Sequence, residues 1–161
     1  MELRAELMPP ILDETNVARL SELAALIDGA SPGQWEDELE EFNHLAGTNL
    51  GHADFQGIYG GMDHETWVRA VLAEPARKRV PDITRAELLE LIRRVVTADG
   101  EEHETIFWLG LLETNVPDPR ISDLIFWPGE YFGDGDNSRG LSPEQILDIA
   151  LSAGKEGQAH T

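Results

Sequence analysis

The sequence predicts an all-α protein, and three observations support this fold class. Apolar side chains recur at helical spacing along most of the chain, and no segment alternates as a half-buried strand does. Capping boxes that start helices occur at residues 31–34, 84–87 and 142–145, each with Ser or Thr followed three residues later by Gln or Glu. Two prolines flank a basic triplet within residues 74–81, which predicts a boundary between two halves.

The first half contains three predicted helices. Residues 16–28 place Leu20 and Leu23 on one apolar stripe, and Gly29 ends this helix. Asp63 is the predicted cap of a helix that carries Trp67 and Val71. The middle helix opens at the box of residues 31–34, and its apolar stripe is formed by Trp35, Leu39, Phe42 and Ala46.

The second half follows a similar plan. A helix begins after Thr84 and ends at Asp99–Gly100, and another runs from about Glu101 to Asn115. A last helix opens at the box of residues 142–145. Between these helices lies the run Ser122-Asp123-Leu124-Ile125-Phe126-Trp127-Pro128, in which the proline limits any helix to one or two turns.

The two adjacent aromatic residues of this run allow two interpretations. Phe126 and Trp127 are neighbours and cannot both point the same way. In the first interpretation, both side chains complete a hydrophobic core. The run could instead be a short presented element whose aromatic residues anchor a protein partner, because Trp and Tyr are enriched at interface hot spots. Leu124 and Ile125 would then hold the element on the domain.

Within the helix at residues 101–115, the stretch Ile106–Leu112 is apolar around its whole circumference, which a surface helix of a small bundle should not be. At about 100° per residue, the side chains of this stretch fall into three groups that point in different directions from the helix axis. Trp108 and Leu112 are the core candidates, and we expect Phe107 and Leu111 to face the first half. The third group consists of Ile106, Leu109, Gly110 and Glu113, which share one stripe of the helix.

Composition excludes several classes of protein. With 31 acidic and 12 basic residues among 161, the net charge of −19 argues against direct nucleic-acid binding and favours a basic partner. No apolar run is long enough to span a membrane, and Met1–Arg4 does not open a signal peptide. The absence of cysteine is compatible with a reducing compartment, and we expect a cytoplasmic protein.

The sequence predicts no catalytic residue, no metal site and no cofactor. The five histidines are scattered singly, and His64–Glu65 lacks the second histidine of a zincin helix. The Gly/Asp-rich loop at residues 133–140 begins as a calcium loop does, but Arg139 and Gln145 occupy the positions of the required glycine and glutamate. A flexible loop is favoured, and an acidic calcium-dependent regulator is the weakest of our hypotheses.

Residues 83–151 resemble the immunity proteins that protect bacteria against their own DNase colicins and pyocins. Residues 84–91 are similar to that family's first helix, an acidic second helix follows, and the Ser-Asp-Leu-Ile-aromatic-aromatic-Pro run stands where the family has its short third helix. The first half resembles the second half more weakly, as a diverged repeat would. Residues 20–23 match 88–91, and residues 53–55 match 122–124. Residues 56–60 depart from the run, so its docking role is not transferred to them.

The resemblance implies two tandem four-helix units, each with a short third helix. We expect a diverged first repeat at residues 1–74, a linker at 75–82, the immunity-protein-like domain at 83–154 and a flexible tail at 155–161.

The resemblance also implies a function without catalysis, in which the protein binds beside the active site of a basic toxin nuclease and excludes DNA. In the family, the second helix selects the toxin and the short third helix supplies the common binding energy. Phe126 and Trp127 stand where two tyrosines are usual, which leaves a general protein-interaction module as the alternative. The expected partner-binding residues are Asp123, Phe126, Trp127, Pro128, Glu102, Thr105, Ile106, Leu109 and Glu113.

Overall fold

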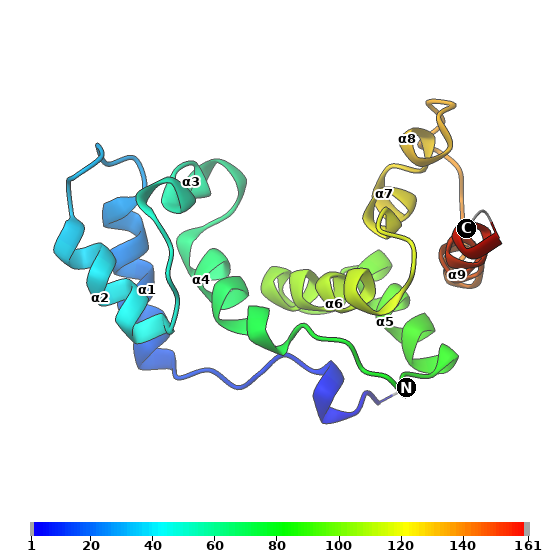
Figure 1. Ribbon diagram of the computed structural model, residues 1–161, viewed down its shortest axis with the longest axis horizontal. Helices are drawn as coiled ribbons and strands as arrows, with labels where there is room; N and C mark the ends of the chain where they lie inside the picture. The colour runs from blue at the N-terminus through cyan, green and yellow to red at the C-terminus, as the bar shows by residue number, and fades with distance from the viewer. Residues whose placement is uncertain (1, 160–161) are drawn as a thin grey trace. The chain divides into compact units, whose positions relative to one another are not determined.

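The computed structural model describes the backbone of residues 2–159, and within that range it contains helices and connecting segments without strands (Figure 1). The predicted all-α class is therefore confirmed. The contacts within the chain define two compact units. Residues 10–74 form the N-terminal unit, and the first nine residues together with the chain from Pro75 onward form the C-terminal unit.

The N-terminal unit packs α1 (Glu14–Ile27) against α2 (Glu36–Ala46) and α4 (His64–Ala73). Two short elements, η2 (His52–Phe55) and α3 (Ile58–Gly61), connect α2 to α4. Three aromatic rings meet in the core, with centroids 4.9 to 5.8 Å apart. They belong to Phe42, Phe55 and Trp67, and the aliphatic stripe of α1 packs around them.

One predicted helix start in this unit is wrong. The helix expected from residue 32 begins at Glu36 instead, because Gly33 and Trp35 both have a left-handed backbone, with φ of 85° and 62°. Trp35 is consequently exposed rather than part of the stripe that contains Phe42. By contrast, the predicted cap of α4 is confirmed, since the amide of Thr66 donates to Asp63 at 2.7 Å.

The C-terminal unit is built on α5 (Arg85–Thr97), which packs against α6 (Glu102–Asn115) and α9 (Pro143–Ala159). The short helix α7 (Ile121–Phe126) contacts α6 and α9, and α8 (Pro128–Phe132) follows it directly. Both predicted capping boxes of this unit form. Thr84 and Glu87 exchange hydrogen bonds of 3.1 and 2.9 Å, and Ser142 and Gln145 do the same.

The N-terminal strap, residues 2–9 with the single turn η1 (Ala5–Leu7), packs on this C-terminal unit. Leu3 and Leu7 are buried. The guanidinium of Arg4 donates to both carboxylate oxygens of Glu87, at 2.7 and 2.6 Å, and also bonds Asp82. The Arg4 hydrogen bonds lower the pKa of Glu87 to about 2, although burial opposes the shift.

The turn η3 (Glu74–Ala76) stands at the junction of the two units. The helix α9 extends into the segment expected to be a tail, and residues 160 and 161 of that expected tail lie outside the described part of the chain. Among residues 2–159, no helix combines the length and apolar character that crossing a bilayer requires.

Candidate docking surface

The short helix α7 presents two aromatic side chains at its C-terminal end. Phe126 and Trp127 are 45% and 53% exposed, whereas Ile121 and Leu124 of the same helix are fully buried. The helix stops here because Trp127 has a non-helical backbone, with φ of −135° and ψ of 58°, ahead of Pro128. The aromatic residues therefore do not complete a core, and the interpretation of the run as a presented element agrees with their exposure.

Pro128 lies differently from its two aromatic neighbours. It is buried and starts α8, where a proline fits because the first turn of a helix needs no amide donor. The sequence pattern gave no indication of α8. Because Pro128 is buried, it exposes little surface to a partner. Its place in this region is the start of α8, directly after Trp127.

The loop after α8 is held against the start of that helix. The amide of Gly129 donates to the Asn137 side chain at 2.8 Å, and the carbonyl of Gly129 accepts from the amides of Asp134 and Gly135. A Cβ at position 129 would lie 2.5 Å from backbone atoms of Gly135 and Asp136. Only glycine allows this approach, which fixes the loop at residues 133–138 against the α7–α8 junction.

Arg120 connects α7 to α8. Its guanidinium donates to Asp123 at 3.3 Å and to the carbonyl of Glu130 at 3.0 Å, and it lies over the Tyr131 ring, 5.1 Å from the centroid. Asp118, which is buried, accepts from the amide of Arg120 and from the Tyr131 hydroxyl. Helical periodicity gave no signal for this network, because its members lie in the connecting segment and in two helices of only six and five residues.

The predicted partner-selecting residues lie on the outward side of α6. Glu102 and Glu113 are exposed, while Thr105, Ile106 and Leu109 are half-buried. The opposite side of α6 carries four buried residues, Phe107, Trp108, Leu111 and Leu112. The expectation that two of these face the first half stays a prediction. Because α6 and α7 pack together, the two groups of predicted site residues lie on neighbouring helices.

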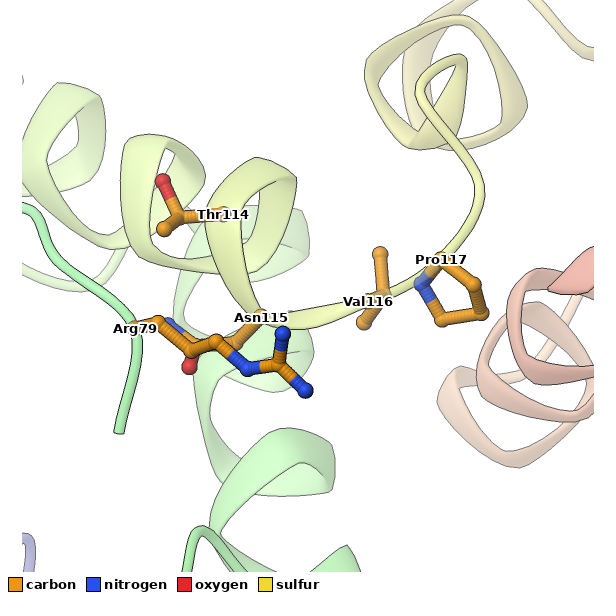
Figure 2. A pocket seen from close by; sticks show the side chains of 5 residues that line it. All are labelled: Arg79, Thr114, Asn115, Val116 and Pro117. Atoms are coloured by element: carbon orange, nitrogen blue, oxygen red, sulfur yellow. The ribbon is translucent and has the colours of Figure 1, made fainter. Parts of the chain in front are cut away.

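A pocket of about 220 Å³ lies at the C-terminal end of α6, lined by Arg79, Thr114, Asn115, Val116 and Pro117 (Figure 2). Asn115 fixes the preceding linker there, because its side chain accepts from the amide of Val80 at 2.7 Å and donates to the carbonyl of Lys78 at 3.3 Å. The linker at residues 78–80 is thus a packed segment alongside α6.

The carboxylates of the Gly/Asp-rich loop are engaged within the loop. Asp134 accepts from the amide of Asp136 at 3.0 Å and pairs with Arg139, and Asp136 accepts from the amide and hydroxyl of Ser138. These hydrogen bonds lower the pKa of both aspartates. In the described part of the chain, no group of three or more histidine or carboxylate side chains is arranged to hold a metal ion.

Comparison with known proteins gives a match that lies within the C-terminal unit. Residues 80–152 match the family described as colicin immunity protein / pyocin immunity protein. A relative from Bacillus subtilis (strain 168), the uncharacterized protein YezA, is 34% identical over 70 residues, which is 44% of this chain and 90% of the relative. No solved structure gives a significant match.

Proposed function

Since the chain belongs, through residues 80–152, to the family of colicin and pyocin immunity proteins, we propose that it neutralises a bacteriocin toxin by binding it. The observation that carries this proposal is the exposure of Phe126 and Trp127 at the end of a short helix. Exposed aromatic residues on a rigid element are typical anchors of tight protein interfaces, because they bury a large apolar area with little loss of conformational freedom.

We infer that the partner is the basic nuclease domain of such a toxin. The chain carries a net charge of −19, and Glu102 and Glu113 are exposed on the stripe expected to select the toxin. A strongly acidic surface accelerates association with a basic partner and disfavours acidic ones. Asp123, next to the aromatic pair, would contribute a further carboxylate, in competition with its own Arg120.

The mechanism that follows is stoichiometric inhibition without chemistry. The docked protein would cover a surface beside the nuclease active site and repel DNA phosphates by its bulk and its charge. Immunity proteins act by binding, and we infer that this chain likewise has no enzymatic activity and no cofactor, and that it acts in the cytoplasm, where it meets the toxin before export.

We also propose that the N-terminal unit is a diverged copy of the C-terminal one. Residues 53–55 correspond in sequence to 122–124, and the matched residues Phe55 and Leu124 are each fully buried in a short helix. The aromatic pair has no counterpart in residues 56–60, so the proposed docking role is restricted to the C-terminal unit.

The proposal is tested with purified DNase domains of the colicin and pyocin type, including any encoded beside this gene. The full chain should inhibit DNA cleavage by one such domain at a 1:1 ratio, and the Trp127→Ala variant should not at the same concentration. Lys78→Ala, a change in the linker, is the matched control that should inhibit normally. A folded wild-type chain that leaves every nuclease active would favour the alternative, a protein-interaction module that retains the fold.

A further inference from the structure

Trp127 is held through its backbone from both sides. Its amide donates to the carbonyl of Asp123 in α7 at 2.6 Å. Its own carbonyl accepts from the amides of Glu130 and Tyr131 in α8, both at 3.0 Å. Trp127 therefore caps the end of α7 and the start of α8, while its side chain is half exposed. The orientation of the exposed ring depends on how these two short helices are held together.

A buried carboxylate stands at the other end of this arrangement. Asp118 is 4% exposed and lies between Pro117 and Pro119, in the segment that joins α6 to α7. Prolines restrict their own backbone and that of the preceding residue, so Asp118 belongs to a stiff stretch of chain. Its carboxylate accepts from the amide of Arg120 at 2.8 Å and from the Tyr131 hydroxyl. The side chain of Tyr131 thus ties α8 to the segment that precedes α7.

Tyr131 connects the buried carboxylate to the exposed ring. Its hydroxyl bonds Asp118, and its amide bonds the carbonyl of Trp127. Arg120 adds a second connection, because its guanidinium donates to the carbonyl of Glu130 and lies over the ring of Tyr131. Removing a donor from a buried carboxylate is costly, so these contacts favour one geometry of the α7–α8 junction.

An aromatic anchor binds more tightly when it is fixed before the partner arrives. A flexible element loses conformational freedom when a partner orders it, and this loss weakens binding. An element that is already ordered in the free chain avoids the loss. The contacts of Asp118 give Trp127 this property, although Asp118 is itself buried and offers a partner almost no surface.

We propose that Asp118 is a positioning residue of the docking surface, which acts through Tyr131 to hold Trp127 in its binding orientation. This inference rests on the proposed function and deepens it, because it assigns part of the affinity of the exposed ring to a buried carboxylate. Asp118 and Tyr131 should therefore matter for binding although neither needs to contact the toxin.

The experiment measures the affinity and the dissociation rate of the full chain on a panel of inactivated DNase domains of the colicin and pyocin type. Tyr131→Phe removes only the hydroxyl and should weaken binding about fivefold or more through faster dissociation. Asp118→Ala should weaken binding at least as much. The two changes together should weaken it no more than Asp118→Ala alone, because both remove the same hydrogen bond. Asp118→Asn keeps an acceptor for the Arg120 amide and gains a donor for the Tyr131 oxygen, so it should retain most of the affinity.

Thr66→Val is the matched control, because it removes a hydroxyl that bonds Asp63 in the N-terminal unit. It should change the affinity by about twofold or less. If Tyr131 acts through Trp127, Tyr131→Phe should weaken binding by about twofold or less once Trp127→Ala is in place. Hydrogen exchange of the free chain gives a readout without a partner. The amides of Trp127, Glu130 and Tyr131 should exchange faster in Tyr131→Phe, whereas those of α5 should not.

The outcomes separate this inference from the proposed function. Wild-type affinity for both Tyr131→Phe and Asp118→Ala, or an equal loss for Thr66→Val, would overturn the inference and leave the proposed function intact. An undiminished loss from Tyr131→Phe in the Trp127→Ala protein would do the same, because Tyr131 would then contact the toxin itself. Unchanged hydrogen exchange in Tyr131→Phe would also overturn the inference alone. A wild-type chain that binds no domain of the panel would overturn the proposed function and this inference together.

Discussion

The indole N–H of Trp108 donates a hydrogen bond of 3.2 Å to the backbone carbonyl of Leu7, 101 residues earlier in the chain. The contact is buried, and Arg94 covers the indole ring at 4.9 Å from its centroid. This hydrogen bond joins the strap to the centre of α6, on the side of the helix that faces away from the proposed partner.

We predict that Trp108→Phe lowers the free energy of unfolding by roughly 1–3 kcal/mol, because the buried carbonyl of Leu7 loses its donor while most of the ring volume remains. Urea unfolding followed by circular dichroism measures the loss. Trp127→Phe is the matched control, and since Trp127 is exposed, its cost should stay within about 0.5 kcal/mol. Equal stabilities of the two variants would contradict the assignment of the buried hydrogen bond.

The Arg4–Glu87 pair should make stability depend on pH in the acid range. The pKa of Glu87 falls from its ordinary 4.5 to about 2 in the folded protein, chiefly through the Arg4 hydrogen bonds. A lowered pKa gives stability that is fully present above pH 4.5 and is lost as the pH falls toward 2. The stability difference between wild type and Arg4→Ala should therefore be largest at neutral pH and shrink below pH 4.5.

The measurement is urea unfolding of both proteins at a series of pH values. Arg85→Ala is a suitable control, because Arg85 pairs with Asp148 at 2.7 Å but both side chains are at least half exposed. Such a surface pair contributes little to stability. If the free energies of unfolding of Arg4→Ala and wild type differ by the same amount at pH 7 and at pH 3, protonation of Glu87 does not cause the pH dependence.

We predict that Trp127→Ala leaves the fold almost unchanged and weakens toxin binding by at least about 2 kcal/mol, the range typical of hot-spot residues. Trp108→Ala, by contrast, should cost roughly 3–5 kcal/mol of stability, as deletions of buried aromatic side chains do. Unfolding curves and binding affinities of both variants separate the two roles. A large stability loss with normal affinity for Trp127→Ala would show that the exposed ring is structural.

Gly129→Ala should destabilise the C-terminal unit by about 1–3 kcal/mol, because the new methyl group would overlap backbone atoms of Gly135 and Asp136. The same substitution at Gly140, where a Cβ meets nothing within 4 Å, is the control and should be nearly neutral. The displaced loop should also exchange its amide hydrogens faster, which hydrogen exchange can measure. Unchanged protection of residues 133–138 would refute the close packing.

If the partner is a basic nuclease domain, its association with this chain should slow steeply as salt is added. The Debye length is about 10 Å at 0.1 M salt, so long-range attraction between opposite net charges is screened. Stopped-flow association rates between about 0.05 and 0.5 M salt test this directly, with dissociation rates as the internal control. A flat association rate would argue against a basic partner.

Local signals predicted a large part of the fold. Thr84, Ser142 and Asp63 cap helices where the sequence places them, because a cap depends on residues within one turn of each other. The start of α2 was predicted wrongly at Ser31, where two left-handed residues interrupt an otherwise acceptable capping motif. A left-handed backbone at a tryptophan is uncommon, and no sequence rule anticipates it.

The sequence predicted the residues of the candidate docking surface better than it predicted the contacts that hold this surface in place. The exposure of Phe126 and Trp127 agrees with the presented-element interpretation, but the binding role of the predicted residues stays a prediction. The strap and the Arg120 network were missed because each depends on a tertiary contact rather than a local pattern. In α6, helical spacing did identify Trp108 and Leu112 as core residues, and both are buried.

The strap changes the description of the chain's architecture. Residues 10–74 begin after the strap and end before Pro75, and both flanking segments belong to the C-terminal unit. The N-terminal unit is therefore flanked in sequence by two segments of the C-terminal unit, which is discontinuous in sequence. A fragment cut to residues 80–152 would separate Trp108 from its acceptor and Glu87 from Arg4, whereas a chain that joins Pro9 to Pro75 would retain both contacts.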